Sequence, residues 1–363
     1  MESATEARFV VYGGDINHGF HASILEHLNR KTGLSISFKH IRFKYWADRE
    51  PAFFLHGRDR ILGNDVLIFS CPLDSEQRED LQDMVSACKK QFGARSVTVV
   101  MTFLPFRRQD RLEKEHEITR LRWFLENLKF WGTDNLILCE PHSITNTVKY
   151  CDDCGLRLFL IDPTQAFARS VIEMVLDFGK ESCLAYSPDL GSVLRASRLA
   201  KALGIGMVAT KKDRLSGDAI KTCAENDKDF EMCVREKLCD TSVKFSCHIS
   251  DVSGKNVFIR EDEIETGGTS VETAWMARKA GARTVHFLVT HPVCTPGWID
   301  KLIPYDKPRP FDSIFFGNSR PRGDGRSPYR ESTGGEVQTV DLSPAFAEAL
   351  VEVINEIINS PEV

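Results

Sequence analysis

Short apolar segments recur along the chain, separated by longer stretches whose apolar residues have helical spacing. In the first half these segments are Phe9–Tyr12, Val66–Ser70, Val97–Phe103 and Leu136–Cys139. In the second half they are Leu184–Tyr186, Gly206–Thr210, Val257–Arg260 and Thr284–Thr290. Short apolar runs are typical of buried strands, and strands that alternate with amphipathic helices build parallel sheets. The pattern predicts an α/β fold with two similar units, each a mostly parallel sheet flanked by helices.

The length of 363 residues exceeds the usual size of one domain, which also favours two domains. We place an N-terminal domain at residues 1–163 and a C-terminal domain at residues 164–343. The border falls at Pro163, because proline suits the first turn of a following helix. Residues 344–363 carry apolar positions at helical spacing, so we expect a C-terminal helix there that packs on the N-terminal domain.

Two polar stretches are predicted to be long loops. Residues 211–240 contain few apolar runs, and residues 317–335 are rich in glycine, arginine, proline and serine. Loops of this length in a compact domain are usually either functional or disordered. We therefore look for functional residues at both.

Composition excludes several classes of protein. The formal net charge of -5 argues against a nucleic-acid-binding surface but permits a local basic pocket. No apolar run is long enough to span a bilayer, so no membrane association is expected. The 11 scattered cysteines do not form a disulfide framework and favour a cytoplasmic protein. Cys151 and Cys154 have the spacing of half a zinc site, but without a second pair we expect ordinary thiols.

One segment, residues 257–270, combines a strand, two acids, a Thr-Gly-Gly-Thr turn and a helix start. The backbone N–H groups of such a turn, together with the helix N-terminus, can hold a phosphate. Carboxylates cannot bind phosphate directly, but Glu261 and Asp262 can accept hydrogen bonds from adjacent ribose hydroxyls. The segment therefore predicts a site that binds a sugar and its phosphate together.

This segment resembles the ribose-phosphate loop of type I phosphoribosyltransferases and of phosphoribosyl pyrophosphate synthetases. It lacks the glycine pattern of a Walker loop or of a dinucleotide fold. The resemblance implies two phosphoribosyltransferase-like domains with an active site between them. The implied ribose-phosphate-binding residues are Glu261, Asp262, Glu265, Thr266, Gly267, Gly268, Thr269 and Ser270.

A nucleotide site would distinguish a synthetase from a transferase, and the charged residues after the segment Val97–Phe103 offer one. Arginines can bind a polyphosphate through paired hydrogen bonds, while Gln109 and Asp110 can bond a base or order the arginines. A solvated turn is the alternative. Phosphoribosyl pyrophosphate synthetases carry a similar Arg-Gln-Asp before an Ile-Thr helix, so the resemblance implies ATP binding by Arg108, Gln109 and Asp110.

Two further segments are similar to metal-binding segments of the synthetases. His142, in Glu-Pro-His-Ser, follows a strand where the family has a metal-binding histidine. Asp189, in Ser-Pro-Asp-Leu-Gly, matches an acid linked to Mg²⁺, although a helix N-cap is the structural alternative. The resemblance therefore implies Mg²⁺ as the cofactor.

The same resemblance implies catalytic cations and a nucleotide-binding hairpin. Lys211 matches a catalytic lysine at the start of a loop, and Arg214 is the second expected cation. Positive charge there would stabilise the transition state of diphosphoryl transfer. Phe43, Asp48 and Glu50 are similar to a hairpin that reaches the ATP of a neighbouring subunit, which also implies a homo-oligomer.

The sequence thus predicts a ribose-phosphate diphosphokinase that acts on ATP and ribose 5-phosphate. Glu261 and Glu265 stand where synthetases commonly carry aspartate, and segment 317–335 is longer and more basic than the family's. These departures leave open a larger acceptor that carries ribose 5-phosphate, such as ADP-ribose. Two more functions stay open, that of a phosphoribosyltransferase and that of a non-catalytic regulatory synthetase-like protein.

Overall fold

The computed structural model describes residues 8–13, 17–39, 41–48, 50–112, 115–210, 228–321, 333 and 335–359. Lys211 and Arg214 lie outside these residues. The chain divides into two compact units. Unit 1 comprises Met1–Asp162, Ser319–Gly325 and Leu342–Val363, and unit 2 comprises Pro163–Asn318 and Arg326–Asp341.

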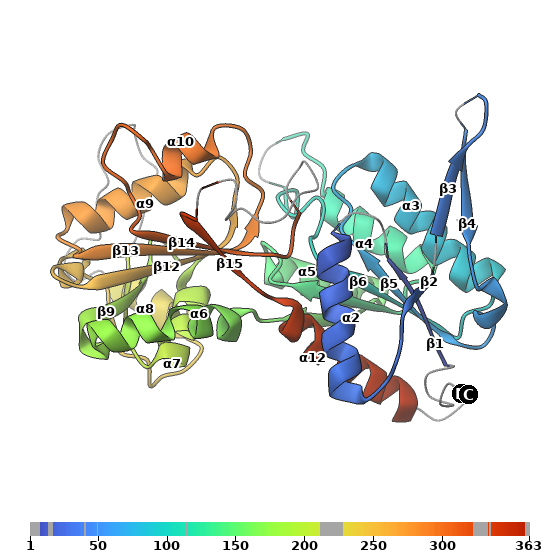
Figure 1. The fold of residues 1–363 in the computed structure, drawn as a ribbon. Coiled ribbons are helices and arrows are strands. Elements are labelled where there is room, and N and C mark those ends of the chain that lie inside the picture. Colours follow the sequence, from blue (N-terminus) through green and yellow to red (C-terminus); the bar gives the residue numbers. More distant parts are fainter. Residues whose placement is uncertain are drawn as a thin grey trace. The chain divides into compact units, whose positions relative to one another are not determined.

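Unit 1 is built on a parallel sheet of six strands in the order β2-β1-β5-β6-β7-β8 (Figure 1). The strands are β1 (Phe9–Gly13), β2 (Phe38–Lys39), β5 (Asp65–Ser70), β6 (Ser96–Met101), β7 (Asn135–Cys139) and β8 (Arg157–Ile161). Its helices are α2 (His18–Thr32), α3 (Ser75–Ser86), α4 (Arg120–Trp131), α5 (Ile144–Cys154) and α12 (Ser343–Asn359), with short helical turns at Arg58–Arg60 and Ala87–Gln91. A separate antiparallel hairpin pairs β3 (Ile41–Tyr45) with β4 (Pro51–Leu55).

The sheet of unit 1 is apolar on both faces, because helices cover both. On one face, Val10 and Tyr12 belong to a buried cluster that includes side chains from α3 and α4. On the other face α2 and α12 pack together, with the rings of Phe20 and Phe346 in edge contact at 5.5 Å between centroids (Figure 1). The last helix of the chain thus completes the core around the first strand.

A buried acid fixes the amino-terminal end of the same sheet. The side chain of Asp65 is 1% exposed and accepts a hydrogen bond from Arg8 Nε at 2.9 Å. It also forms an ion pair with Arg95 and accepts a hydrogen bond from Ser96 Oγ at 2.7 Å. A buried carboxylate is stable only with such partners. This cluster therefore holds together the amino-terminal ends of β1, β5 and β6.

Unit 2 is built on a parallel sheet of seven strands in the order β11-β10-β9-β12-β13-β14-β15. The strands are β9 (Cys183–Ser187), β10 (Gly206–Ala209), β11 (Phe245–Ser246), β12 (Asn256–Ile264), β13 (Thr284–Pro292), β14 (Ser313–Gly317) and β15 (Val337–Val340). The helices are α6 (Thr164–Phe178), α7 (Val193–Leu203), α8 (Lys228–Lys237), α9 (Gly268–Lys279) and α10 (Trp298–Leu302), with helical turns at Lys180–Ser182 and Ile249–Val252.

Both sheets have the same plan of connections. In each, the first strand lies inside the sheet, the next strand (β2) or two strands (β10 and β11) are added on one side, and the later strands are added on the other. The order therefore reverses between β1 and β5 in unit 1 and between β9 and β12 in unit 2. Ligands of open α/β sheets bind where the order reverses, beyond the carboxyl ends of the strands. In unit 2, this place lies next to the acidic pair of β12.

The predicted fold class is confirmed, since both sheets are parallel and flanked by helices. One prediction about residues 211–240 is wrong, because α8 lies within this stretch. Its reason is visible in the packing: Phe230 and Val234, one helical turn apart, are both buried, and two apolar residues were too weak a periodic signal. Within the described part of the chain, every helix is too short or too polar to reach across a lipid bilayer.

Candidate active site

The Arg-Gln-Asp segment of unit 1 follows β6 as a tight turn. Phe106 has a positive φ of 57°, and Gln109 N donates to Phe106 O at 2.9 Å. Arg108 and Gln109 are exposed, whereas Asp110 is only 5% exposed. The turn therefore presents two polar side chains to solvent and buries the third.

Helix α5 holds the buried acid in place. Asp110 Oδ2 accepts a hydrogen bond from Asn146 Nδ2 at 2.8 Å, and the Asp110 carbonyl accepts one from the Tyr150 hydroxyl at 2.7 Å. Both donors lie one turn apart on the same face of α5. Asp110 thus orders the segment, while the side chains of Arg108 and Gln109 are exposed.

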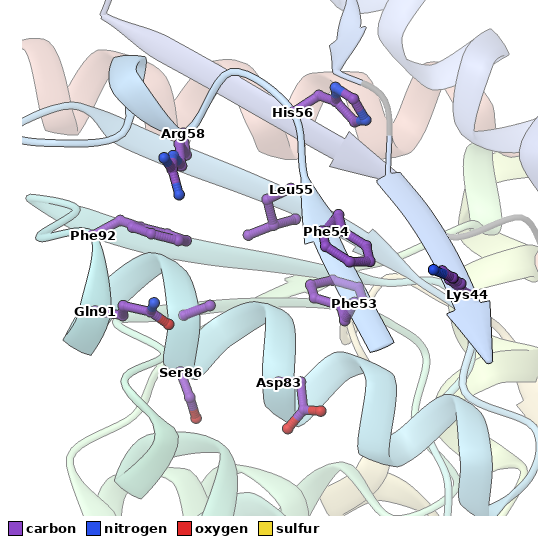
Figure 2. Close-up of a pocket in the computed structure, with 11 residues that line it drawn as sticks. Lys44, Phe53, Phe54, Leu55, His56, Arg58, Asp83, Ser86, Gln91 and Phe92 are labelled. Carbon is purple, nitrogen blue, oxygen red and sulfur yellow. The ribbon is translucent and has the colours of Figure 1, made fainter. Parts of the chain in front are cut away.

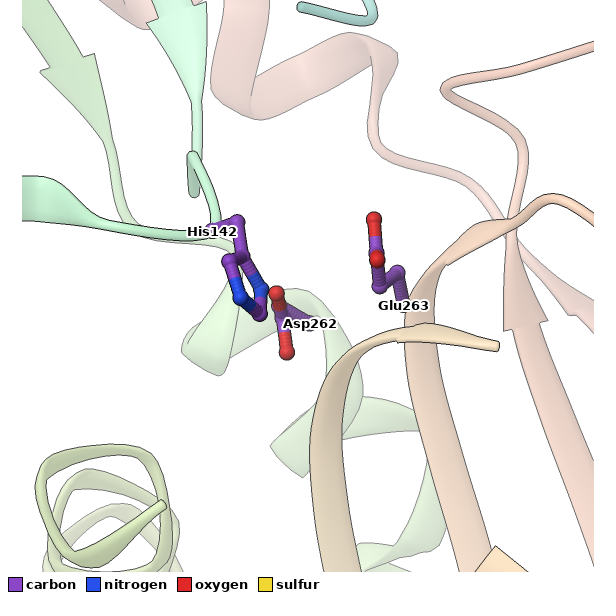
Figure 3. Close-up of side chains that lie close together, drawn as sticks. All are labelled: His142, Asp262 and Glu263. Carbon is purple, nitrogen blue, oxygen red and sulfur yellow. The ribbon is translucent and has the colours of Figure 1, made fainter. Parts of the chain in front are cut away.

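His142 lies on the connection between β7 and α5, at the carboxyl end of the strand next to β6 (Figure 3). Its side chain is exposed. Glu140, two residues earlier, has a positive φ of 37°, and Ser143 caps α5 by accepting from Asn146 N at 3.4 Å. The segment at 108–110 follows β6 and His142 follows β7, so both lie beyond the carboxyl ends of neighbouring strands. Helix α5 contacts the connection after β6 and begins at the end of the connection after β7.

The remaining residues predicted to bind ATP lie on the β3–β4 hairpin. Phe43 is part of β3 and pairs in register with Phe53. Asp48 and Glu50 are exposed near the tip, where Asp48 Oδ1 accepts from Glu50 N at 3.1 Å. The structure places these three on a separate hairpin, Phe43 in its strand β3 and the two acids in the connection, whereas Arg108 and His142 lie beyond the carboxyl ends of the main sheet.

A pocket of about 760 Å³ lies between this hairpin and α3. Figure 2 shows Phe53, Phe54 and Leu55 of β4 on one side of it and Asp83 and Ser86 of α3 on the other. Of the side chains that the structure describes, those of Asp48, Glu50, Arg108, Gln109 and Asp110 do not line it. The pocket is therefore not the site predicted at residues 108–110.

In unit 2, Asp189 follows β9 and is exposed. Its Oδ1 accepts hydrogen bonds from Gly191 N at 2.8 Å and from Ser192 N at 3.1 Å. Asp189 thus has a structural role close to that of an N-cap, since it orders the turn before α7. The same bonds fix the direction of the carboxylate, which suits a ligand role as well.

The acidic pair lies near the carboxyl end of β12, on the other side of the place where the strand order reverses. Asp262 is 5% exposed, and Arg195 Nη2 of α7 lies 3.4 Å from its Oδ1. Burial, followed by the neighbouring charge of Asp262, raises the pKa of Glu261 to about 8, although Arg195 and Arg260 act in the opposite direction. Glu263 follows on the strand and leaves it in another direction than Asp262 (Figure 3). Burial therefore disfavours the ionised form of Glu261.

The predicted ribose-phosphate loop continues directly from the pair. Gly267 has a φ of 77°, and a Cβ atom there would lie 2.2 Å from Leu302 Cδ1, so only glycine fits. Thr295 N, in the segment after β13, donates to the carbonyl of Glu265 at 3.1 Å. This hydrogen bond fixes the backbone at the start of the loop. The N-cap position of helix α9 is Gly267, which has no side chain to bond the first N–H groups of the helix. A helix start of this kind can bind an anion.

The remaining residues of this loop share that position at the helix start. Thr266 and Thr269 are exposed, Gly268 opens α9, and Ser270 is buried in its first turn. The structure thus brings Glu261, Asp262 and the whole loop together at one edge of unit 2. Lys211 comes directly after the described Thr210, which follows β10 and shares a hydrogen bond with the Tyr186 hydroxyl at 2.9 Å.

Sequence reasoning missed two arginines beside the acidic pair. Arg195 pairs with Asp262 across 67 positions of the chain, a contact that no local pattern predicts. Arg260 was assigned only as the end of an apolar run, yet its side chain is fully buried. The sequence did contain a signal for Arg260: a charged residue in a strand that is expected to be buried on both faces. Such residues are rare, so this one could have been singled out.

Cys151 and Cys154 both lie within α5. The described cysteines form no disulfide, and Cys154 Sγ lies 3.4 Å from the carbonyl of Cys151 within α5. Burial raises the pKa of Cys151 to about 12. A thiol this hard to ionise is a poor nucleophile and a poor metal ligand.

Comparison with known proteins agrees with this arrangement. The family model described as the N-terminal domain of ribose phosphate pyrophosphokinase matches residues 9–132. Ribose-phosphate pyrophosphokinase of Deinococcus radiodurans is 26% identical over 359 residues, which cover 95% of this chain and 94% of that protein. The protein of the same name from Mycoplasma genitalium is 22% identical over 337 residues, covering 92% and 89%.

A solved structure extends the likeness to the whole fold. Phosphoribosylpyrophosphate synthetase from Mycobacterium smegmatis aligns with a TM-score of 0.71 at 18% identity. The alignment covers 97% of this chain and 99% of the other. Both units therefore share the fold of that structure.

Proposed function

Because the chain belongs to the family of ribose-phosphate pyrophosphokinases, we propose that it transfers the β,γ-diphosphoryl group of ATP to the anomeric hydroxyl of ribose 5-phosphate. The products are phosphoribosyl pyrophosphate, AMP and a proton. The observation that carries the proposal is the acidic pair of β12, followed by a helix start with glycine at its N-cap, where the strand order of unit 2 reverses.

Each end of the sugar phosphate has a matching group in unit 2. The loop 265–270 and the first turn of α9 bind the 5-phosphate through backbone N–H groups and hydroxyls. Glu261 and Asp262 accept hydrogen bonds from the ribose hydroxyls, which orients the sugar. This division of roles holds the anomeric hydroxyl at a fixed place, and positioning accounts for much of the catalysis of phosphoryl transfer.

Unit 1 provides the nucleotide site in this proposal. Arg108 contacts the phosphates of ATP, and Gln109 contacts the polar edge of its base. Asp110 keeps these two residues in place through its hydrogen bonds to α5. The hairpin residues Phe43, Asp48 and Glu50 contribute to ATP binding in a homo-oligomer. Their exposed acids near the hairpin tip suit contact with a second copy of the chain.

We also propose Mg²⁺ as the cofactor, with His142 and Asp189 as its protein ligands. The exposed carboxylate of Asp189 fits a hard cation, because two N–H donors fix its direction and oxygen is the donor that Mg²⁺ prefers. When bound, Mg²⁺ neutralises phosphate oxygens that the cationic side chains do not reach. Lys211 and Arg214 supply the remaining positive charge.

The reaction joins the anomeric oxygen to the β-phosphorus and breaks the bond between that phosphorus and the oxygen bridging to the α-phosphorus. AMP departs with the bridging oxygen. The negative charge that spreads over the transferred oxygens is stabilised by Lys211 and Arg214. The expected cytoplasmic location stays a prediction.

The test is AMP release from ATP in the presence of Mg²⁺, with ribose 5-phosphate, with ADP-ribose and with neither. We expect AMP only with ribose 5-phosphate, and its loss in Lys211→Ala. Lys212→Ala, which removes an equal charge from the next position, is the matched control and should stay active. AMP formed only with ADP-ribose would assign the larger acceptor, and no AMP with either acceptor would contradict a diphosphokinase.

A further inference from the structure

Arg260 is a charged residue in the interior of unit 2. It lies on β12 directly before the acidic pair, and its exposed fraction is 0%. A guanidinium does not lose its proton in proteins, so this position carries a permanent positive charge. Removing such a charge from water costs several kcal/mol unless partners compensate. The chain therefore maintains a charge where an apolar side chain would be easier to bury.

Three contacts fix the guanidinium. Its carbon lies 4.1 Å from the centroid of the Phe167 ring of α6, and Nη2 donates to Thr290 Oγ1 of β13 at 2.6 Å. Nη1 donates to the carbonyl of Glu261. One helix and two strands thus hold Arg260, so its charge has a single position.

The bond to Glu261 replaces a contact that the sheet no longer makes. The pairing between β9 and β12 ends at Tyr186 and Ile259, one residue before Arg260. Beyond this point β12 continues alone on that side as far as Ile264. The guanidinium therefore fixes the backbone of β12 where the acidic pair begins and where β9 no longer supports it.

The acidic pair itself requires positive charge. Glu261 and Asp262 are adjacent carboxyl groups in a largely buried place, where like charges disfavour double ionisation. Arg195 approaches Asp262 from α7, and its side chain is 12% exposed. Arg195 also lowers the pKa of Glu261, and Arg260 is the second cation that does so. The contact of Arg260 itself is with the backbone carbonyl of Glu261. Two guanidinium groups from different elements thus offset the charge of the acidic pair.

We propose that Arg260 is a positioning residue for the sugar: it fixes the end of β12 and keeps Glu261 and Asp262 oriented as acceptors for the ribose hydroxyls. This inference rests on the proposed function. Replacing buried charged groups with well-packed hydrophobic residues often leaves protein stability unchanged or raises it. A role in substrate binding gives a reason for the buried charge. Stability alone does not account for an arginine here.

The test measures binding of ribose 5-phosphate by calorimetry in the full chain, with ATP binding and thermal unfolding measured in parallel. Arg260→Met should weaken ribose 5-phosphate binding by about tenfold or more and leave ATP binding within about twofold. Arg260→Lys, which retains the charge without the paired donors, should recover part of the loss.

A second pair of variants keeps the test decisive if Arg260→Met does not fold. Thr290→Val removes the hydroxyl that accepts from Arg260 and should weaken ribose 5-phosphate binding several-fold. Thr284→Val makes the same change at the opposite end of β13, where the hydroxyl donates to Asn256 Oδ1 at 2.8 Å. It should lower the melting temperature without changing the affinity for ribose 5-phosphate.

The outcomes separate this inference from the proposed function. Equal affinity for ribose 5-phosphate in wild type, Arg260→Met and Thr290→Val would overturn the inference alone. Parallel losses of ATP and ribose 5-phosphate binding would also overturn it, because they indicate a general structural role. A wild-type protein that binds ATP but no ribose 5-phosphate would overturn the proposed function, and the inference with it.

Discussion

The ionisation of Glu261 predicts how the affinity for ribose 5-phosphate depends on pH. With a pKa of about 8, roughly one tenth of Glu261 is ionised at pH 7 and roughly nine tenths at pH 9. The carboxylate accepts hydrogen bonds from ribose hydroxyls, whereas the protonated group also donates one. If the ionised form binds the sugar, the KM for ribose 5-phosphate falls by up to about tenfold between pH 7 and pH 9.

The assay is AMP formation at saturating ATP and Mg²⁺, with ribose 5-phosphate varied at each pH. Glu261→Gln is the control, because the amide keeps the size and does not titrate in this range. Its KM should be nearly constant from pH 7 to pH 9. A wild-type KM that does not change, or one that changes equally in Glu261→Gln, would refute the reasoning.

The ionisation of Glu261 also affects the stability of the fold. As the pH rises, the affinity for ribose 5-phosphate should increase, whereas the contribution of Glu261 to stability should decrease. The folded-state pKa of Glu261 is raised from its ordinary value of 4.5, so around pH 6 the folded protein holds a proton that the unfolded chain has released. The contribution to stability is complete below about pH 4.5 and is lost as the pH rises through about 8. Thermal unfolding of wild type minus that of Glu261→Gln should show this slope.

Three further predictions concern the rest of the two units. Gly267→Ala should destabilise the protein by at least ~1 kcal/mol in urea unfolding, since alanine is strained at this φ and collides with its neighbour, whereas Gly268→Ala, which is unstrained, should retain wild-type stability. Tyr150→Phe should raise the KM for ATP about fivefold by removing ~1 kcal/mol of support from Asp110, and an unchanged KM would show that the bond does not order the segment. Asp65→Asn should lower the free energy of unfolding by ~3 kcal/mol, because it leaves its arginine partners without a counter-charge, and a loss below ~1 kcal/mol would contradict that role.

The central strands could be predicted from sequence because burial on both faces makes them continuously apolar. β5 and β7, for example, are buried at every residue and match predicted segments within one residue. β8 was missed: it is an edge strand in which Arg157 and Leu160 are exposed, so its apolar run is only four residues long. Helix α8 was missed because its buried face consists of two residues.

In the candidate site, too, some features could be predicted from the sequence and others could not. The acids and glycines of 261–270 are contiguous, so their joint position could be predicted from one segment. The bond between Asp110 and Asn146 joins residues 36 positions apart, and only the packing of α5 against the turn brings them together. Sequence therefore identified candidates for binding, but it did not identify the residues that hold them. The roles of Lys211 and Arg214 remain predictions.

The position of α12 has a consequence for how the protein is made. The helix covers α2 through the contact between Phe20 and Phe346, and Arg8 Nη2 donates to the carbonyl of Ile357 at 2.7 Å. The segments around β1 and α2 are therefore synthesised long before α12, and their core closes only after unit 2 has been synthesised between them. Translation that stalls before α12 would release a nascent chain with an uncovered apolar face, a substrate for chaperones and proteases.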